Sequence, residues 1–424
     1  MTNARAPQLG ASLDEWLHWI EAVHPNEIEL GLTRATAVAL KAKLLPVDIP
    51  IITVAGTNGK GSTVAMLDAM YQAAGYSTGV YTSPHIVRFN ERISMTGKPA
   101  SDAVIIKAFE TIESVREDTQ LTYFEFATLA AMHVFVHSQC DIILLEVGLG
   151  GRLDTTNVWD TDCAVVTSIA IDHESWLGSD REKIGAEKIG IGRSDVPLIM
   201  GDQDPPRSVL NAAIDAGMQL QRVPAESMRD PLTLSLPGQH QQSNAHAALL
   251  AVSALQNRLP VPLPVAKTAV ADVRVPGRFE QQRIDGVLVV QDVAHNPAAA
   301  ASVVAGFEER FPKSPVFAVF GALDDKDLTG VVKELNAVVR HWHCISLADA
   351  RGTVASELCA AVTAVGGACT AHNSFAAALD AAYGRASAYN STHPLPEAVV
   401  LVVGSFFTLT ALHAHWKDVG RLSR

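Results

Sequence analysis

The chain has 424 residues, too many for one ordinary hydrophobic core, so we expect two domains. Its net charge of −12, with no block of lysine or arginine, argues against nucleic acid as a main partner, because affinity for phosphate backbones needs clustered basic charge. Five scattered cysteines without a C-x-x-C pair argue against a disulfide framework or a zinc site, and no apolar run resembles a signal peptide or could span a bilayer, so we expect a cytoplasmic protein with no membrane partner.

The first half of the chain alternates strand-like and helix-like segments. It opens with the spacing of a capping box at Ser12 and Glu15, followed by apolar residues at helical intervals. Apolar runs that indicate strands follow at 51–55, 78–82, 141–146, 164–169 and 196–200, separated by helix-length stretches. Strands joined by helices imply crossover connections, so the prediction is a mostly parallel sheet.

A proline-dotted region at 260–277 interrupts this alternation, which then restarts. Further strands are expected at 287–291, 316–320, 343–347 and 398–403. We therefore predict a larger α/β domain over residues 1–276 and a smaller α/β domain over residues 277–424.

A glycine-rich loop, Gly56-Thr57-Asn58-Gly59-Lys60-Gly61-Ser62, lies between the first expected strand and an expected helix. Such a loop lets backbone N–H groups surround phosphate oxygens, while Lys60 adds a point charge and Ser62 could reach Mg²⁺. The match to the usual pattern is incomplete, because Val54 and Gly61 replace an expected glycine and an expected hydroxyl residue. The alternative is a glycine-rich turn without a ligand. The strand before the loop and the helix after it favour a nucleoside triphosphate site.

Other polar motifs also follow the ends of expected strands. They are Ser83-Pro84-His85, Glu146 to Arg152 and Ser168 to His173 in the first domain, and Asp292 to Pro297, Gly321 to Asp327 and Gly404-Ser405 in the second. Open α/β sheets bind ligands at the carboxyl ends of their parallel strands. We therefore expect an active site in a cleft between the two domains.

Two of these residues suggest a metal site, and each has a structural alternative. Glu146 at a strand end could hold Mg²⁺, which prefers oxygen ligands, or it could pair with Arg152. His173 could ligate a metal through a ring nitrogen, but its spacing alone favours a histidine partnered by Asp172.

Three further features are ambiguous on spacing. Lys188 reads as a solvated helix lysine, and Arg278 beside the domain boundary could reach phosphates or form a structural salt bridge. An aromatic group could form a stacking wall but alone reads as core: Tyr123, Phe124 and Phe126.

Taken in order, the motifs resemble the folylpolyglutamate synthase family of the Mur ligase superfamily, and within it the bacterial bifunctional dihydrofolate synthase/folylpolyglutamate synthases. The resemblance covers nearly the whole chain. It implies a P-loop ATPase domain with a mostly parallel sheet and a smaller Rossmann-like α/β C-terminal domain. The motifs that carry it are Gly56 to Ser62, Ser83 to Arg92, Thr122 to Glu125, Glu146 to Asn157, Ser168 to His173, Pro276 to Phe279 and Asp292 to Pro297.

The resemblance implies a role for each matching residue. Contacts to ATP are implied for Asn58, Gly59, Lys60, Gly61, Ser62, Asn244, Arg278 and Asp292. Ser83, Glu146 and His173 match magnesium ligands, which reverses the interpretation of His173 from spacing. Lys188 matches a lysine that the family carries as a carbamate, so the implied catalytic residues are Lys60, Lys188 and His173. Pterin-site segments match Glu29, Leu30, Gly31, Leu32, Thr122, Tyr123, Phe124, Glu125, Leu153, Asp154 and Thr155.

The implied activity is an ATP-dependent amide ligase. It would add L-glutamate to dihydropteroate and to reduced folates through an acyl phosphate, with Mg²⁺ as cofactor, small molecules as its only partners and a monomeric state. Asp154 is a plausible hydrogen-bond partner for pterin ring nitrogens. Ile189 and Glu174-Ser175 depart from the family pattern, and Ile189 affects packing near the carbamate. The alternatives are a monofunctional folylpolyglutamate synthase, another Mur-type amino-acid ligase, and a P-loop switch protein.

Overall fold

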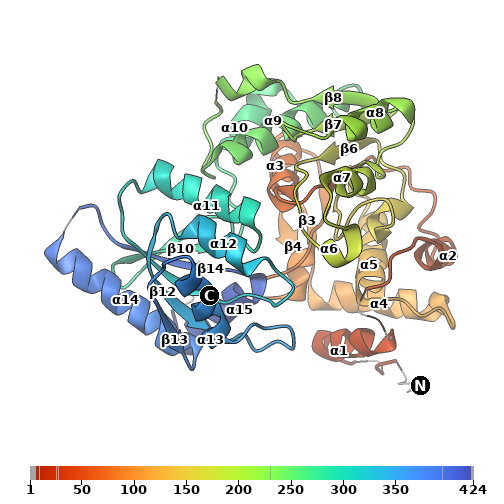
Figure 1. Cartoon of the computed structure of the whole chain (residues 1–424). Helices are drawn as coiled ribbons and strands as arrows, with labels where there is room; N and C mark the ends of the chain where they lie inside the picture. The colour runs from red at the N-terminus through yellow and green to blue at the C-terminus, as the bar shows by residue number, and fades with distance from the viewer. Residues whose placement is uncertain are drawn as a thin grey trace. The chain divides into compact units, whose positions relative to one another are not determined.

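The computed structural model describes residues 6–421 except Leu9, Pro25, Glu27, Asp230 and Pro394. The chain forms two compact units (Figure 1). The first contains the chain up to Thr233 together with Gln242–Val273, and the second contains Leu234–Gln241 and the chain from Arg274 onward. The main division falls three residues before the expected boundary at 276/277, and the short segment 234–241 groups with the second unit.

The first unit is built on an eight-stranded sheet with the order β4-β3-β2-β5-β1-β6-β7-β8. The strands from β2 to β8 in this order are parallel, and β3 and β4 add an antiparallel edge. All five strands predicted from apolar runs are present, whereas β3, β4 and β8 were not expected because they are short or polar. The bounds are β1 Ile51–Ala55, β2 Thr78–Tyr81, β3 Ile93–Met95, β4 Lys98–Pro99, β5 Ile142–Glu146, β6 Cys163–Val166, β7 Pro197–Met200 and β8 Gln219–Arg222.

Helices of the first unit include α1 with the predicted capping box, in which Ser12 and Glu15 exchange hydrogen bonds. The proline-dotted region contains α10, whose prolines lie at its start, where a missing N–H breaks no helical hydrogen bond. Helix α9 runs across the division between the units. The bounds are α1 Leu13–Val23, α2 Thr33–Lys41, α3 Lys60–Ala73, α4 Asp102–Arg116, α5 Tyr123–Ser138, α6 Glu174–Leu177, α7 Arg181–Ile189, α8 Arg207–Asp215, α9 Gln239–Ala254 and α10 Leu263–Ala271, with 3-10 turns η1 Phe89–Arg92, η2 Thr155–Val158 and η3 Ala225–Arg229.

The second unit has a six-stranded sheet with the order β13-β12-β11-β14-β10-β9, in which only β9 is antiparallel. The four predicted strands are present, and β12 begins four residues earlier than expected. The strand bounds are β9 Glu280–Ile284, β10 Val287–Asp292, β11 Val316–Phe320, β12 Val339–Ile345, β13 Cys369–His372 and β14 Val399–Val403. The helices are α11 Pro297–Arg310, α12 Leu328–Leu335, α13 Ala355–Ala364, α14 Phe375–Thr392 and α15 Phe406–Asp418.

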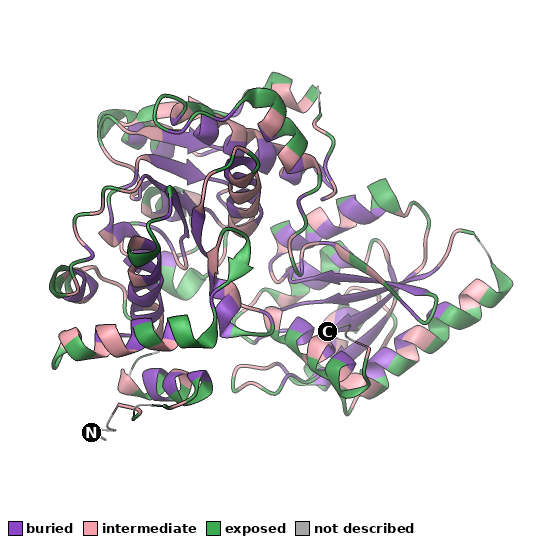
Figure 2. Ribbon diagram, turned by 180° about the vertical axis from the view of Figure 1, so that it is seen from behind, coloured by how far each residue is buried: buried purple, intermediate pink, exposed green. Residues whose placement is uncertain are grey.

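In both units the central strands are buried on both faces. Every residue of β1, β5, β11 and β14 is buried (Figure 2). Helices α11 and α14 bury one side only, whereas α5 is buried without interruption from Glu125 to Met132. This is the pattern of parallel sheets with helices on their faces. No helix in the described residues combines the length and the apolar character needed to cross a membrane.

Candidate active site

The glycine loop connects β1 directly to α3, as the sequence predicts. Gly56 and Gly59 have φ angles of 151° and 91°, which residues with a side chain rarely adopt. A Cβ atom would lie 1.9 Å from Thr167 Oγ1 at Gly56, and 2.5 Å from Asn244 Oδ1 at Gly59. The loop therefore needs glycine at both positions, and Asn244 from α9 lies against it.

The segment after β6 holds this loop in place. Thr167 Oγ1 donates to the carbonyl oxygen of Asn58 at 2.6 Å, and the backbone N–H of Asn58 donates to Ser168 Oγ at 3.0 Å. The N–H of Thr57 donates to the carbonyl oxygen of Ser168 at 2.8 Å. Sequence reasoning did not name Thr167, and it included Ser168 only as the start of the polar motif at this sheet edge. Their hydroxyls at the end of a strand next to β1 were the available signal.

Lys60 lies over the glycine loop. Its Nζ atom donates to the carbonyl oxygens of Gly56 at 3.0 Å and Thr57 at 3.2 Å. Ser62 is buried in the first turn of α3. The loop thus has a positive charge at its rim and the N-terminus of a 14-residue helix behind it, an arrangement suited to phosphate.

Ser83 and Glu146 meet beside the loop. They follow or end the neighbouring strands β2 and β5, and the backbone N–H of Ser83 donates to Glu146 Oε2 at 3.2 Å. Glu146 is only 5% exposed, and a Cβ atom on Gly61 would lie 3.5 Å from its Oε2. A buried carboxylate and a hydroxyl at one sheet edge are the hard oxygen donors that Mg²⁺ prefers. Arg152, the alternative partner of Glu146, pairs with Glu187 at 2.8 Å.

His173, the third expected metal ligand, is exposed and precedes α6 with a φ angle of 52°. Its backbone N–H donates to Asp172 Oδ1 at 2.8 Å. The described residues contain no group of three or more His, Cys, Asp or Glu side chains arranged to hold a metal. Mg²⁺ at this edge would take further oxygen ligands from the substrate or from water.

Lys188 is buried in the last turn of α7, so the interpretation as a solvated lysine from spacing is wrong. Its exposed fraction is 3%. The pKa of its amine is lowered to about 7, mainly by burial and also by the nearby positive charge of Lys60, while Asp172 acts in the opposite direction. The apolar residues around α7 that cause the burial belong to the core formed with β6 and β7.

The three segments expected to bind a pterin converge, although they lie far apart in sequence. Arg34 joins two of them, because its guanidinium contacts both Glu29 and Glu125. Its Nη2 lies 3.1 Å from Glu125 Oε1, and Glu125 is only 2% exposed. The N–H of Gly31 donates to the carbonyl oxygen of Leu153 at 3.3 Å and so joins the third segment. Sequence reasoning missed Arg34, which lies 91 residues from Glu125.

Thr122 and Glu125 form a capping box at the start of α5, which fixes this segment. The three aromatic residues nearby divide into two kinds. Phe126 is fully buried against Phe109 and Trp19 and belongs to the core. Tyr123 and Phe124 are half-buried.

Asp154 is buried, and its carboxylate already accepts four hydrogen bonds. Oδ2 accepts from the N–H groups of Gly148 and Leu149 at 3.0 and 2.9 Å, and Oδ1 accepts from the N–H and hydroxyl of Thr156 at 2.9 and 2.6 Å. These contacts use the roughly four acceptor positions of a carboxylate. In this conformation Asp154 shapes the loop after β5 and has no acceptor position left over for a pterin ring. Burial raises the pKa of Asp154, and the hydrogen bonds to its carboxylate partly oppose this effect.

In the second unit, Asp292 ends β10 and organises the turn that follows. Its carboxylate accepts from the N–H groups of Phe279 and Ala294, both at 2.8 Å. Burial raises the pKa of Asp292, and the positive charge of Arg278 opposes that effect. The guanidinium of Arg278 stacks over the ring of Phe406 at 5.9 Å from its centre. Arg278 and Asp292 are therefore near each other at the carboxyl end of this sheet.

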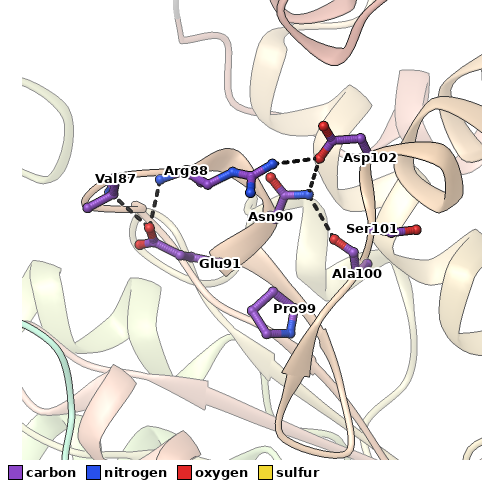
Figure 3. Close-up of a pocket in the computed structure, with 8 residues that line it drawn as sticks. All are labelled: Val87, Arg88, Asn90, Glu91, Pro99, Ala100, Ser101 and Asp102. Carbon is purple, nitrogen blue, oxygen red and sulfur yellow. Dashed lines mark hydrogen bonds and ion pairs between the residues drawn. The ribbon is translucent and has the colours of Figure 1, made fainter. Parts of the chain in front are cut away.

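A pocket of about 470 Å³ lies beside the segment that follows Ser83 (Figure 3). Glu91 shapes the loop by accepting hydrogen bonds from three consecutive backbone N–H groups, at 2.7 to 2.9 Å. Arg88 and Asn90 both donate to Asp102 Oδ1, at 2.9 and 2.8 Å. The pocket contains none of the predicted site residues and is lined by Val87, Arg88, Asn90, Glu91, Pro99, Ala100, Ser101 and Asp102.

Known proteins are similar to this chain over nearly its whole length. Residues 277–406 match the family described as Mur ligase, glutamate ligase domain. The chain is 41% identical, over 96% of both chains, to the dihydrofolate synthase/folylpolyglutamate synthase of Escherichia coli (strain K12). It is 32% identical to the Bacillus subtilis (strain 168) protein of the same name, over 80% of this chain and 86% of that protein.

Solved structures agree with these sequence matches. An E. coli FolC structure in complex with DHPP and ADP is similar with a TM-score of 0.87 and 39% identity, over 98% of this chain and 100% of that one. A Yersinia pestis bifunctional folylpolyglutamate synthase/dihydrofolate synthase complexed with AMPPNP and Mn ion is similar with a TM-score of 0.86 and 36% identity, over 97% and 100%. The predicted α/β fold class is confirmed.

Proposed function

This chain belongs to the dihydrofolate synthase/folylpolyglutamate synthase family, and we propose that it joins L-glutamate to dihydropteroate and, in a second activity, to reduced folates. It is an ATP-dependent ligase. The observation that carries the proposal is the 41% identity, over 96% of both chains, to an enzyme named for both activities. The convergence of the three expected pterin segments through Arg34 and Gly31 supports the first activity.

The reaction needs ATP because a carboxylate has no good leaving group. Transfer of the γ-phosphoryl to a carboxylate oxygen gives an acyl phosphate and ADP. The α-amine of glutamate then attacks the carbonyl carbon, and inorganic phosphate leaves as the amide forms and the amine loses a proton. A binding site that excludes water protects the acyl phosphate from hydrolysis.

We propose that the loop from Asn58 to Ser62 binds the ATP phosphates, with Asn244 beside it. The support is the contact between Asn244 and Gly59 and the position of the Lys60 charge. Lys60 would move from the loop carbonyls to the transferring phosphoryl, where its charge would stabilise the transition state. Arg278 and Asp292 are proposed as ATP contacts from the second unit, on the family resemblance.

Ser83, Glu146 and His173 are proposed to hold a divalent metal. The oxygen donors of Ser83 and Glu146 fit such an ion, and the related Y. pestis structure is described as complexed with Mn ion. When bound, a divalent cation would neutralise charge on the phosphate oxygens. Glu146 itself fixes the Ser83 loop by accepting its N–H.

Lys188 is proposed to be carbamylated. A carbamate forms when a neutral amine attacks CO₂ and loses a proton, so it needs a lysine that is partly neutral at physiological pH. The pKa of about 7 that burial gives Lys188 meets this condition. The product replaces a buried cation near Lys60 with an anion, which removes a repulsion between two positive charges.

We propose that the segments 29–32, 122–125 and 153–155 form the pterin site. Tyr123 and Phe124 would supply ring surface, and Glu29 and Glu125 would supply carboxylates held by Arg34. For Asp154 the structure favours a positioning role through the loop after β5. We also propose that the enzyme acts as a monomer on small molecules alone, which light scattering of the purified protein would check.

The test is product formation by the purified full-length protein. We expect dihydropteroate, ATP, Mg²⁺ and glutamate to give dihydrofolate, with ADP released in equal amount, and a reduced folate to give its longer glutamate product. Omission of any one substrate should abolish product in mass spectrometry. If the protein lengthens reduced folates but makes no dihydrofolate, the proposal is reduced to a monofunctional folylpolyglutamate synthase. ADP release that does not depend on glutamate would overturn the proposal.

A further inference from the structure

Arg92, at the end of η1, is a buried cation with few partners. Its exposed fraction is 9%. Its guanidinium donates from Nε to His85 Nδ1 at 2.8 Å, and among the described residues no carboxylate forms an ion pair with it. Arginine has five N–H donors, so four remain for other acceptors. Burying a charge without a paired anion is costly unless a ligand supplies that anion.

The contacts of the Arg92 guanidinium include two aromatic rings. The guanidinium carbon lies 5.8 Å from the centre of the Phe89 ring and 5.4 Å from that of Tyr123. Because a guanidinium can only donate, Nδ1 of His85 is the acceptor of their hydrogen bond. Burial raises the pKa of Tyr123, so its hydroxyl stays uncharged. Aromatic faces stabilise the cation but do not neutralise it.

Arg92 also lies between two parts of the proposed site. Through His85 it touches the loop that begins at Ser83, and through Tyr123 it touches the first turn of α5, which belongs to the proposed pterin site. A substrate that joins these two parts would have its reacting carboxylate near the Ser83 side and its ring system near the α5 side.

We propose that Arg92 binds the carboxylate of the pteroate or folate substrate, the group that ATP activates. This inference rests on the proposed function and adds a substrate-binding residue to it. Guanidinium and carboxylate match in charge and in planar shape, and two parallel hydrogen bonds would fix the carboxylate toward the phosphoryl donor. The residue would also discriminate against neutral analogues, because they would leave its buried charge unpaired.

The test compares two ligands of nearly the same shape, 7,8-dihydropteroate and its primary carboxamide, which lacks the negative charge and carries an NH₂ group in place of one oxygen. Both are measured by calorimetry without ATP under anaerobic conditions. We expect the wild-type protein to prefer the carboxylate roughly 10- to 100-fold, as for a hydrogen bond to a charged group. Arg92→Met should bind both ligands alike, and Arg92→Lys should keep part of the preference. The matched control is Arg88→Met, an exposed arginine of the same segment paired with Asp102, which should keep the full preference.

The ratio of the two affinities separates binding from a structural role. If Arg92 only supports the loop, Arg92→Met will weaken both ligands equally and leave the preference intact, which overturns the inference. An unchanged preference with unchanged affinities overturns it too. Should Arg92→Met not fold, Arg92→Lys and Arg92→Gln carry the same comparison. Failure of the wild-type protein to make dihydrofolate would instead refute the proposed function, independently of Arg92.

Discussion

A single methyl group at Gly59 tests whether the glycine loop depends on the shape seen here. Gly59 has φ 91° and ψ −8°, and an added Cβ would lie 2.5 Å from Asn244 Oδ1. The unfavourable backbone angle costs about 1–2 kcal/mol, and displacing the neighbouring side chain adds about 1–3 kcal/mol. Gly59→Ala should therefore lower the free energy of unfolding by about 2–5 kcal/mol if the loop keeps its shape.

If the loop rearranges to relieve this strain, the same free energy should appear as lost ATP affinity, about 30- to 5000-fold. Urea denaturation and titration calorimetry with ADP together measure both parts. Gly61→Ala is the control for stability, because its Cβ would make only ordinary contacts with Glu146, from 3.5 Å, and alanine favours a helix. The double variant Gly59→Ala/Asn244→Ala should recover only the free energy lost to the clash with Asn244, because the unfavourable backbone angle remains. A Gly59→Ala protein with normal stability and normal nucleotide affinity would refute the reasoning.

Four further variants test other parts of the site. Lys60→Met should slow amide synthesis about 10²- to 10³-fold with an unchanged denaturation midpoint, because it removes a charge from the transferring phosphoryl; normal kcat in a folded variant would contradict this. The Lys188 amine loses its proton near pH 7 in the folded chain but only near pH 10.5 in the unfolded chain. In CO₂-free buffer, the free energy of unfolding of the wild type minus that of Lys188→Met should therefore rise between these two pH values. If this difference fell as the pH rose, it would be inconsistent with the low pKa. Arg34→Met should lower the free energy of unfolding by about 3 kcal/mol and raise KM for dihydropteroate. The double variant Arg34→Met/Glu125→Leu should recover part of that stability. If the losses of the two single variants simply add in urea titrations, Arg34 and Glu125 do not interact. Asp154→Ala leaves four donors without their acceptor and should reduce kcat/KM more for dihydropteroate than for a reduced folate; equal losses would remove it from the pterin site.

Local patterns sufficed for much of the fold and for the edge of the first sheet. The strand, loop and helix around Gly59 are contiguous in sequence, and Glu146 ends an apolar run, so the residue pattern alone places both at a sheet edge. The edge strands β8 and β13 were missed because they are polar or partly exposed and lack an apolar run.

Contacts between distant segments could not be read in the same way. Arg34 gives no sign in sequence that it will meet Glu125, since nothing in either segment specifies their packing. Lys188 looks solvated on its own helix, because its burial comes from the core that α7 shares with β6 and β7. The role of Asp154 depends on four donors, and only the folded loop brings the two from Gly148 and Leu149 to its side chain.

The most direct test of the account follows the oxygen atoms of the substrate. Dihydropteroate labelled with ¹⁸O in its carboxylate is incubated with the protein, ATP, Mg²⁺ and glutamate, and the products are analysed by mass spectrometry and ³¹P NMR. An acyl phosphate route predicts dihydrofolate together with inorganic phosphate that carries one ¹⁸O for each amide formed. Amide formation with unlabelled phosphate, or ATP cleavage without dihydrofolate, would contradict the account.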